Sequence, residues 1–89
     1  MELIYSPTAQ DHIEFWKKSG NKQVQKRISE LVNDIAAHPT TGKGKPELLH
    51  GDLVGYWSRC ITDEHRIVYE INYDENQVYI LFLKYHYNK

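Results

Sequence analysis

Three polar residues in the second half of the chain are of types that move protons and hold developing negative charge. Glu47 follows a Gly-Lys-Gly-Lys-Pro segment, Arg66 lies in a stretch rich in β-branched and aromatic residues, and His86 lies near the last residue. If their strands are antiparallel neighbours, the three side chains converge at one sheet edge. Such a group suits transfer at an RNA phosphodiester: Glu accepts the 2′-OH proton, Arg stabilises the phosphorane, and His protonates the leaving 5′-oxygen. This reaction needs no metal ion or cofactor, because the nucleophile is part of the substrate.

Each of these residues also has a simpler interpretation. Glu47 by itself is a solvated loop carboxylate, and His86 an ordinary surface histidine, because both residue types are often exposed. Arg66 can pair with Glu64 or Glu70 across a turn, which adds little stability if the pair is exposed. The lysines of the glycine-rich segment can be solvated side chains. Spacing alone therefore leaves a catalytic group and a set of surface residues as alternatives.

The composition describes one small globular domain. The chain has 89 residues and a mass of 10.5 kDa, with 40% apolar and 26% charged residues, and we expect residues 1–89 to form a single domain. No apolar run approaches the roughly 18–20 residues that span a bilayer, and the first residues lack a signal-peptide pattern. The lack of such a run leads us to expect no membrane partner. Because the one cysteine, Cys60, cannot form an internal disulfide, we expect a reducing compartment, the cytoplasm.

The charge gives no global argument for a nucleic-acid partner. The net charge is −1 at pH 7, and basic and acidic residues are evenly spread. A protein of this composition that binds RNA must do so through a local basic patch.

Two amphipathic helices are predicted in the first half of the chain. Ser6-Pro7 supplies an N-cap and a proline at the first helical position, and this helix should end near residues 19–21. Asn21 can cap the second helix, which ends at His38-Pro39 because the residue before proline leaves the α region. The apolar stripe of the second helix consists of Val24, Ile28, Leu31, Val32 and Ile35.

The second half of the chain has the two-residue period of β-strands. Residues 2–5 are extended, a short strand begins at 48–49, and longer strands cover 55–62, 65–73 and 77–87, the last of them central. Two helices followed by strands with short turns indicate an α+β fold. We expect both helices to pack on one face of an antiparallel sheet.

Alternation along the strands sorts the candidate side chains between the two faces. Arg59 and Cys60 should lie on opposite faces of their strand. Lys84 and His86 should lie together on one face of the last strand. The apolar residues expected on that same face are Val78, Ile80 and Phe82.

Two longer motifs go beyond composition. One runs Gly42-Lys-Gly-Lys-Pro-Glu47-x-Leu49, and the other runs Gly55-Tyr-Trp-Ser-Arg59-x-Ile-x-x-Glu-His-Arg66-Ile-Val-Tyr69. The chain then closes with Tyr-His86-Tyr87. In order and spacing these motifs resemble the YoeB (Txe) family of bacterial toxins, within the RelE-like superfamily, over nearly the whole chain.

The resemblance implies a fold and a function. The fold would be a small microbial-ribonuclease-like α+β domain. The activity would be endonucleolytic cleavage of messenger RNA in the ribosomal A site, leaving a 2′,3′-cyclic phosphate and a 5′-hydroxyl. A YefM-like antitoxin would neutralise the toxin, operator DNA would be bound only through the toxin–antitoxin complex, and the toxin could form a homodimer. A non-cleaving translation blocker or antitoxin-titrating module, and a ParE-like toxin acting on DNA gyrase, remain the alternatives.

The family's functional positions fall on named residues of this chain. Glu47 matches the general base, His86 the general acid, and Arg66 the arginine that stabilises the transferring phosphate. Tyr87 matches a terminal tyrosine beside the site. The resemblance also implies that Lys43, Lys45 and Arg59 lie near the RNA path, and we expect Lys84 to supply further charge there.

Two positions depart from the family pattern, and both remove positive charge. Cys60 stands where a second arginine is common, and His50 where a lysine is common. Because phosphate contacts supply the salt-dependent affinity for RNA, we expect either weaker ribosome binding than in more basic relatives or a positive charge concentrated on one face.

The Cys60→Arg variant tests this expectation. It should bind ribosomes more tightly than the wild type at about 150 mM salt, with a salt slope steeper by about one unit for one added phosphate contact. Sedimentation of the protein with ribosomes over a salt series measures both quantities. Equal affinities at that salt concentration would contradict the expected charge deficit.

Overall fold

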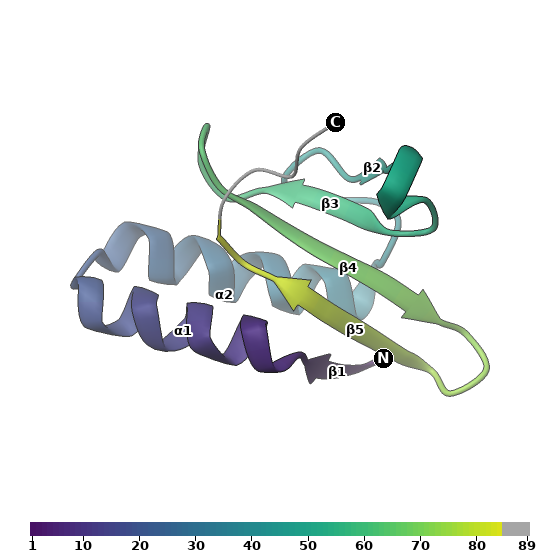
Figure 1. The fold of residues 1–89 in the computed structure, drawn as a ribbon, viewed down its shortest axis with the longest axis horizontal. Coiled ribbons are helices and arrows are strands. Elements are labelled where there is room, and N and C mark those ends of the chain that lie inside the picture. The colour runs from purple at the N-terminus through teal and green to yellow at the C-terminus, as the bar shows by residue number, and fades with distance from the viewer. Residues whose placement is uncertain (85–89) are drawn as a thin grey trace.

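The computed structural model describes residues 1–84, in which two helices cover one face of a five-stranded sheet (Figure 1). The elements in chain order are β1 (Glu2–Tyr5), α1 (Pro7–Ser19), α2 (Lys22–Ala37), β2 (Glu47–Leu48), a 3-10 helix (Gly51–Leu53), β3 (Trp57–Cys60), β4 (Arg66–Asn72) and β5 (Gln77–Phe82). The strand order is β1-β5-β4-β3-β2. The predicted α+β class and the two helices on one face are therefore confirmed.

The sheet differs from the prediction in two respects. It is mixed, because β1 pairs in parallel with β5, whereas the other neighbours are antiparallel. The central strand is β4, and β5 lies between β4 and β1. Both differences arise from the pairing of β1 across the length of the chain, which has no local signal in the sequence.

The helix ends form as the sequence predicts. Ser6 Oγ accepts a hydrogen bond from the Ala9 N–H at 2.9 Å and donates to the Leu81 carbonyl at 2.5 Å. The cap of α1 is thus also a tie to the end of β5. Gly20 ends α1 in the left-handed conformation, with φ of 73°. Asn21 Oδ1 caps α2 by accepting from the Val24 N–H at 3.1 Å.

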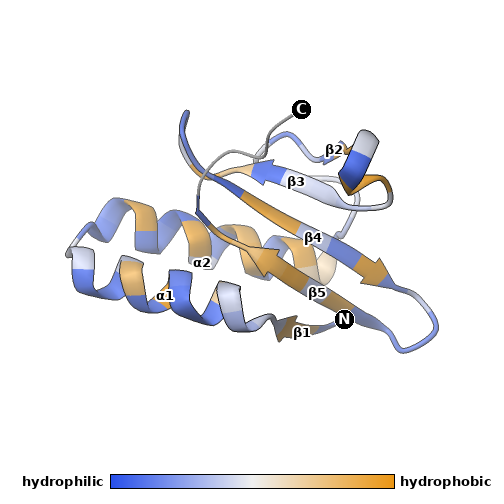
Figure 2. Cartoon of the chain, viewed as in Figure 1, coloured by the Kyte–Doolittle hydropathy of each residue, from blue (hydrophilic) through white to orange (hydrophobic). Residues whose placement is uncertain are grey.

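The core lies between the helices and the sheet. Figure 2 shows hydrophobic residues along β5 and on the helices, whereas the β4–β5 turn is hydrophilic. The residues of this core with no exposed surface are Ala9, Leu31, Ile35, Ile67, Tyr69, Val78, Ile80 and Leu83. Within the described residues, neither helix is long and apolar enough to cross a bilayer.

The end of β5 departs from simple alternation. A register shift in the β4–β5 ladder pairs Tyr69 with Ile80 but Val68 with Phe82. Phe82 therefore faces away from Ile80, and Leu83 continues the buried face. The prediction that Phe82 shares a face with Ile80 is wrong for this reason, since a bulge reverses the alternation of the strand. Lys84 follows the end of β5, so the strand pairing does not assign it to a face.

Candidate active site on the far face of the sheet

The strand register places Glu47 and Arg66 on the far face, the face of the sheet turned away from α1 and α2. Glu47 lies opposite Ser58, and Cys60 lies opposite Arg66. Directly opposed residues share a face, and residues two apart on one strand do so as well. The structure thus brings these two predicted catalytic residues to one face, on strands separated only by β3.

Ser58 joins the two predicted residues. Its side chain is fully buried, and its Oγ accepts a hydrogen bond from Arg66 Nε at 3.1 Å. Glu47 is the residue opposite Ser58 across the β2–β3 pair, and it is exposed. Arg66 is therefore held by a buried hydroxyl on β3, and the exposed Glu47 lies on the strand that pairs with the other edge of β3. That arrangement can bind an anion at the guanidinium and accept a proton at the carboxylate.

The described residues hold part of the predicted site. His86 and Tyr87 lie outside residues 1–84, so their roles stay predictions. Lys84 is described, and its ammonium lies over the Phe15 ring of α1, 3.5 Å from the ring centroid. Its predicted contact with RNA is likewise untested.

The glycine loop, residues 40–46, leads directly into Glu47. Lys43 and Lys45 of this loop are both exposed, as an RNA-facing role requires. A Cβ on Gly42 would lie 2.1 Å from Asp34 Oδ2, and a Cβ on Gly44 would lie 2.9 Å from a methyl group of Leu31. The φ values of 113° and 80° also favour glycine, so the backbone conformation and the neighbouring side chains both restrict these two positions.

The loop is also bonded on both sides. The Lys43 N–H donates to Asp34 Oδ2 at 3.0 Å, and the Gly44 carbonyl accepts from the Cys60 N–H at 2.8 Å. The first bond ties the loop to α2, and the second ties it to β3. The backbone that carries the two lysines and precedes Glu47 is therefore fixed at two points.

The burial of Arg59 contradicts the prediction that it contacts RNA. It has no exposed surface and lies on the helix-facing side of β3, opposite Ile67. Its guanidinium makes a salt bridge from Nη1 to Asp34 Oδ2 at 2.5 Å, and its Nε donates to the Tyr69 hydroxyl at 3.1 Å. A side chain enclosed in this way has no surface to offer a substrate.

The remaining donors of Arg59 bind the chain between α2 and β2. Nη1 also donates to the Lys43 carbonyl at 3.1 Å, and Nη2 donates to the carbonyls of His38 and, at 2.9 Å, Thr41. The Tyr69 hydroxyl extends the network by donating to the Pro39 carbonyl at 2.7 Å. The expected opposition of Arg59 and Cys60 holds, so residue 60, not residue 59, shares the face of Arg66.

Sequence reasoning missed two residues that support the site. Asp34 was one of the polar residues outside the apolar stripe of α2, and Ser58 was a small residue between aromatic neighbours. A signal for Ser58 did exist, because alternation already placed it on the opposite face from Arg59. Asp34 had no such signal, since its partner lies 25 residues away in sequence.

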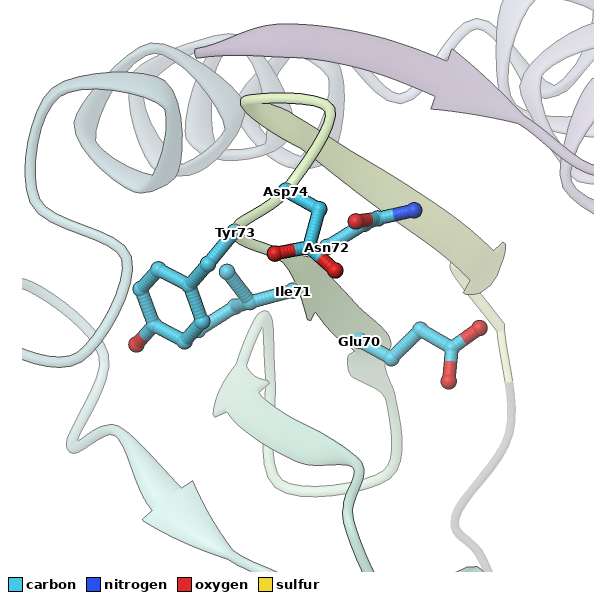
Figure 3. A pocket seen from close by; sticks show the side chains of 5 residues that line it. All are labelled: Glu70, Ile71, Asn72, Tyr73 and Asp74. Atoms are coloured by element: carbon cyan, nitrogen blue, oxygen red, sulfur yellow. The ribbon is translucent and has the colours of Figure 1, made fainter.

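A hollow of about 370 Å³ lies elsewhere, at the β4–β5 hairpin, where residues 70–74 line it (Figure 3). Glu70 and Asp74 give it two carboxylates, which disfavour a phosphate by like charge. The register of the strands, rather than this hollow, therefore locates the candidate site. Within residues 1–84, His, Cys, Asp and Glu side chains form no group of three or more that could hold a metal ion.

Comparison with known proteins agrees with this architecture at two levels. The fold matches that of a YoeB/ParE toxin from Agrobacterium tumefaciens, with a TM-score of 0.91 and 36% identity over 98% of this chain and 100% of that one. The fold is therefore that of a small bacterial toxin. The chain belongs to the family of YoeB-like toxins of bacterial type II toxin–antitoxin systems, whose model matches residues 5–87.

Two further similarities support the family. Toxin YoeB of Escherichia coli K12 is 42% identical over 87 residues, which cover 98% of this chain and 100% of the relative. A heterotetrameric YoeB–YefM complex from Staphylococcus aureus contains a chain with a TM-score of 0.84 and 36% identity, covering 98% of both chains.

Replacing Arg59 by leucine should destabilise the fold by about 3–5 kcal/mol, because the Asp34 carboxylate loses its buried partner. Arg27→Leu is the matched control, since Arg27 on α2 donates from a partly buried position to the Cys60 carbonyl at 3.3 Å. We expect the control to lose about 0.5–1.5 kcal/mol. Urea unfolding of both variants measures the difference, and equal losses would contradict the role assigned to Arg59.

Asp34 should make stability depend on pH. Its bonds from the Lys43 N–H and then from Arg59 hold the pKa of Asp34 below the ordinary value of 3.8. Its contribution to the free energy of unfolding is therefore fully present above that value and is lost as the pH falls through the lower folded pKa.

The Asp34→Asn variant tests this dependence. It should be less stable than the wild type at neutral pH, and it should lose less stability than the wild type between about pH 5 and pH 1. Asp63→Asn, in an exposed turn, is the control. Denaturant unfolding across this range gives the two slopes, and parallel slopes for Asp34→Asn and wild type would refute the linkage.

Proposed function

We propose that this chain is a ribosome-dependent endoribonuclease toxin that cleaves messenger RNA in the A site. The observation that carries the proposal is that Glu47 and Arg66 lie on one face of the sheet, on the two strands that flank β3, whose Ser58 hydroxyl accepts a hydrogen bond from Arg66. Family membership supports the toxin role. The exposed lysines of the glycine loop, which precede Glu47, supply positive charge near the same strand.

The reaction follows from the chemistry of these groups. Glu47 accepts the proton of a ribose 2′-OH, and the freed O2′ attacks the adjacent phosphorus. The P–O5′ bond then breaks, and His86 donates a proton to the leaving 5′-oxygen. Arg66 holds the charge that develops on the non-bridging phosphate oxygens. The products are a 2′,3′-cyclic phosphate and a 5′-hydroxyl, and the atoms balance without any other reactant.

The fixed position of Arg66 favours this chemistry. A guanidinium that is partly buried and already bonded through Nε to Ser58 needs little reorganisation when charge develops on a phosphate. Nη1 and Nη2 of the same group can form a bidentate contact with two phosphate oxygens. Lys43 and Lys45 are exposed, so their contacts to phosphate should weaken as salt rises.

The proposed partners follow from the relatives. The Staphylococcus aureus complex pairs a YoeB chain with YefM, and we propose that a YefM-like antitoxin binds this chain. Operator DNA would be bound only through the toxin–antitoxin complex. The other proposed partners are the ribosome and its messenger in the cytoplasm. In the site itself, Tyr87 would lie beside the reacting phosphate.

Single substitutions of the base and the acid test the enzyme. In translation of a defined messenger, the wild type should cut at discrete A-site positions, whereas Glu47→Ala and His86→Ala should cut about 10²–10⁴ times more slowly. Glu75→Ala, an exposed carboxylate in the β4–β5 turn, is the matched control and should cut normally. Primer extension maps the cuts.

Two other results would change the proposed function. Inhibited synthesis with an intact messenger, in wild type and variants alike, would identify a translation blocker that does not cleave. Cutting that survives both substitutions would remove Glu47 and His86 from the mechanism.

A further inference from the structure

Both backbone groups of Leu83 form hydrogen bonds with side chains of α1. Its N–H donates to His12 Nδ1 at 3.1 Å, and its carbonyl accepts from Trp16 Nε1 at 3.0 Å. His12 and Trp16 lie one turn apart and therefore on the same side of α1. The β4–β5 pairing ends at Phe82, so these two side chains take over where the strand ladder stops.

The geometry of this clamp, formed by His12 and Trp16, is fixed by further ring contacts. The His12 ring meets Phe82 edge-on, with centroids 6.4 Å apart, and the Trp16 ring meets His65 edge-on at 4.9 Å. Leu83 itself has no exposed surface, so loss of the His12 acceptor leaves a donor in a buried site. The clamp is thus built into the core and is not a chance surface contact.

The clamp requires a neutral His12. Because Nδ1 accepts the Leu83 N–H, the ring proton belongs on Nε2. Burial lowers the pKa of His12, the charges of Lys84 and His65 act in the same direction, and Asp11 opposes them. The acceptor is therefore present at neutral pH.

The clamp lies close in sequence to the proposed general acid. His86 follows Leu83 by three residues, and a span of that length reaches at most about 10 Å. The anchor directly before Leu83 is Phe82, which pairs with Val68 at the end of the β4–β5 ladder. Without the clamp, the last anchored backbone position therefore lies four residues before His86 instead of three.

We propose that His12 and Trp16 are positioning residues for the general acid, acting through the backbone of Leu83. They touch neither substrate nor the reacting atoms. Their effect is to fix the backbone of Leu83, three residues before His86 in the sequence. The inference rests on the proposed function, because it assigns a role to the same site.

Two substitutions at His12 separate positioning from packing. His12→Leu removes the acceptor for the Leu83 N–H, whereas His12→Asn keeps one, because an asparagine Oδ1 can occupy the place of Nδ1. In single-turnover cleavage on programmed ribosomes, His12→Leu should lower the rate at saturation about tenfold, with half-saturation nearly unchanged. His12→Asn should restore most of the rate.

A second variant and a control guard against loss of folding. Trp16→Phe removes the donor to the Leu83 carbonyl and keeps an aromatic ring, and it should lower the rate in the same way. Val24→Ala, in the core side of α2, weakens packing without touching Leu83 and should leave the rate of folded protein unchanged. Amide exchange of Leu83 should accelerate in the clamp variants and not in the control.

The outcomes distinguish this inference from the proposed function. If His12→Leu and Trp16→Phe cleave messenger as fast as the wild type, the positioning role of the clamp is overturned and the proposed function is not. An equal loss in Val24→Ala, or no rescue by His12→Asn, would also overturn it, since packing would then explain the effect. No cutting by the wild type would overturn the proposed function and the inference with it.

Discussion

A guanidinium without solvent contact must find both its counter-charge and its hydrogen-bond acceptors inside the protein. Arg59 finds its counter-charge in Asp34 and its other acceptors in the Tyr69 hydroxyl and in three backbone carbonyls between the end of α2 and β2. One side chain therefore ties together α2, the connecting loop and two strands. These parts are thus connected by an ion pair and hydrogen bonds around one buried guanidinium.

The loop that precedes Glu47 owes its shape to this network. A loop of this composition would otherwise be flexible, because glycines and exposed lysines have little surface to bury. Here Arg59 and Asp34 bind its backbone from one side, and the Cys60 N–H binds it from the other. The interior cation thus acts on the candidate site indirectly, by fixing the path of the chain that reaches it.

Much of the architecture was predictable from local patterns. The two helices and their caps follow from Ser6-Pro7, Asn21 and the apolar stripe, and alternation placed Arg59 and Cys60 on opposite faces. The parallel place of β1, the bulge before Phe82 and the Arg59–Asp34 pair were not predictable, because each depends on residues far apart in sequence. The motifs identified Arg59 as a cation of the RNA path, yet residue type does not say which face of a strand is buried.

The pairing of β1 with β5 has a consequence for how the molecule comes into being. Glu2 pairs with Gln77, so β1, the first strand to be synthesised, cannot join the sheet before β5 has been made. Contacts of such long sequence separation slow folding, since the loop between them must close before they form. The sheet therefore closes only after β5 has been synthesised. Because the N-cap Ser6 and the clamp residues of α1 bond to the end of that same strand, a nascent chain lacks the anchors of its C-terminal segment until that moment.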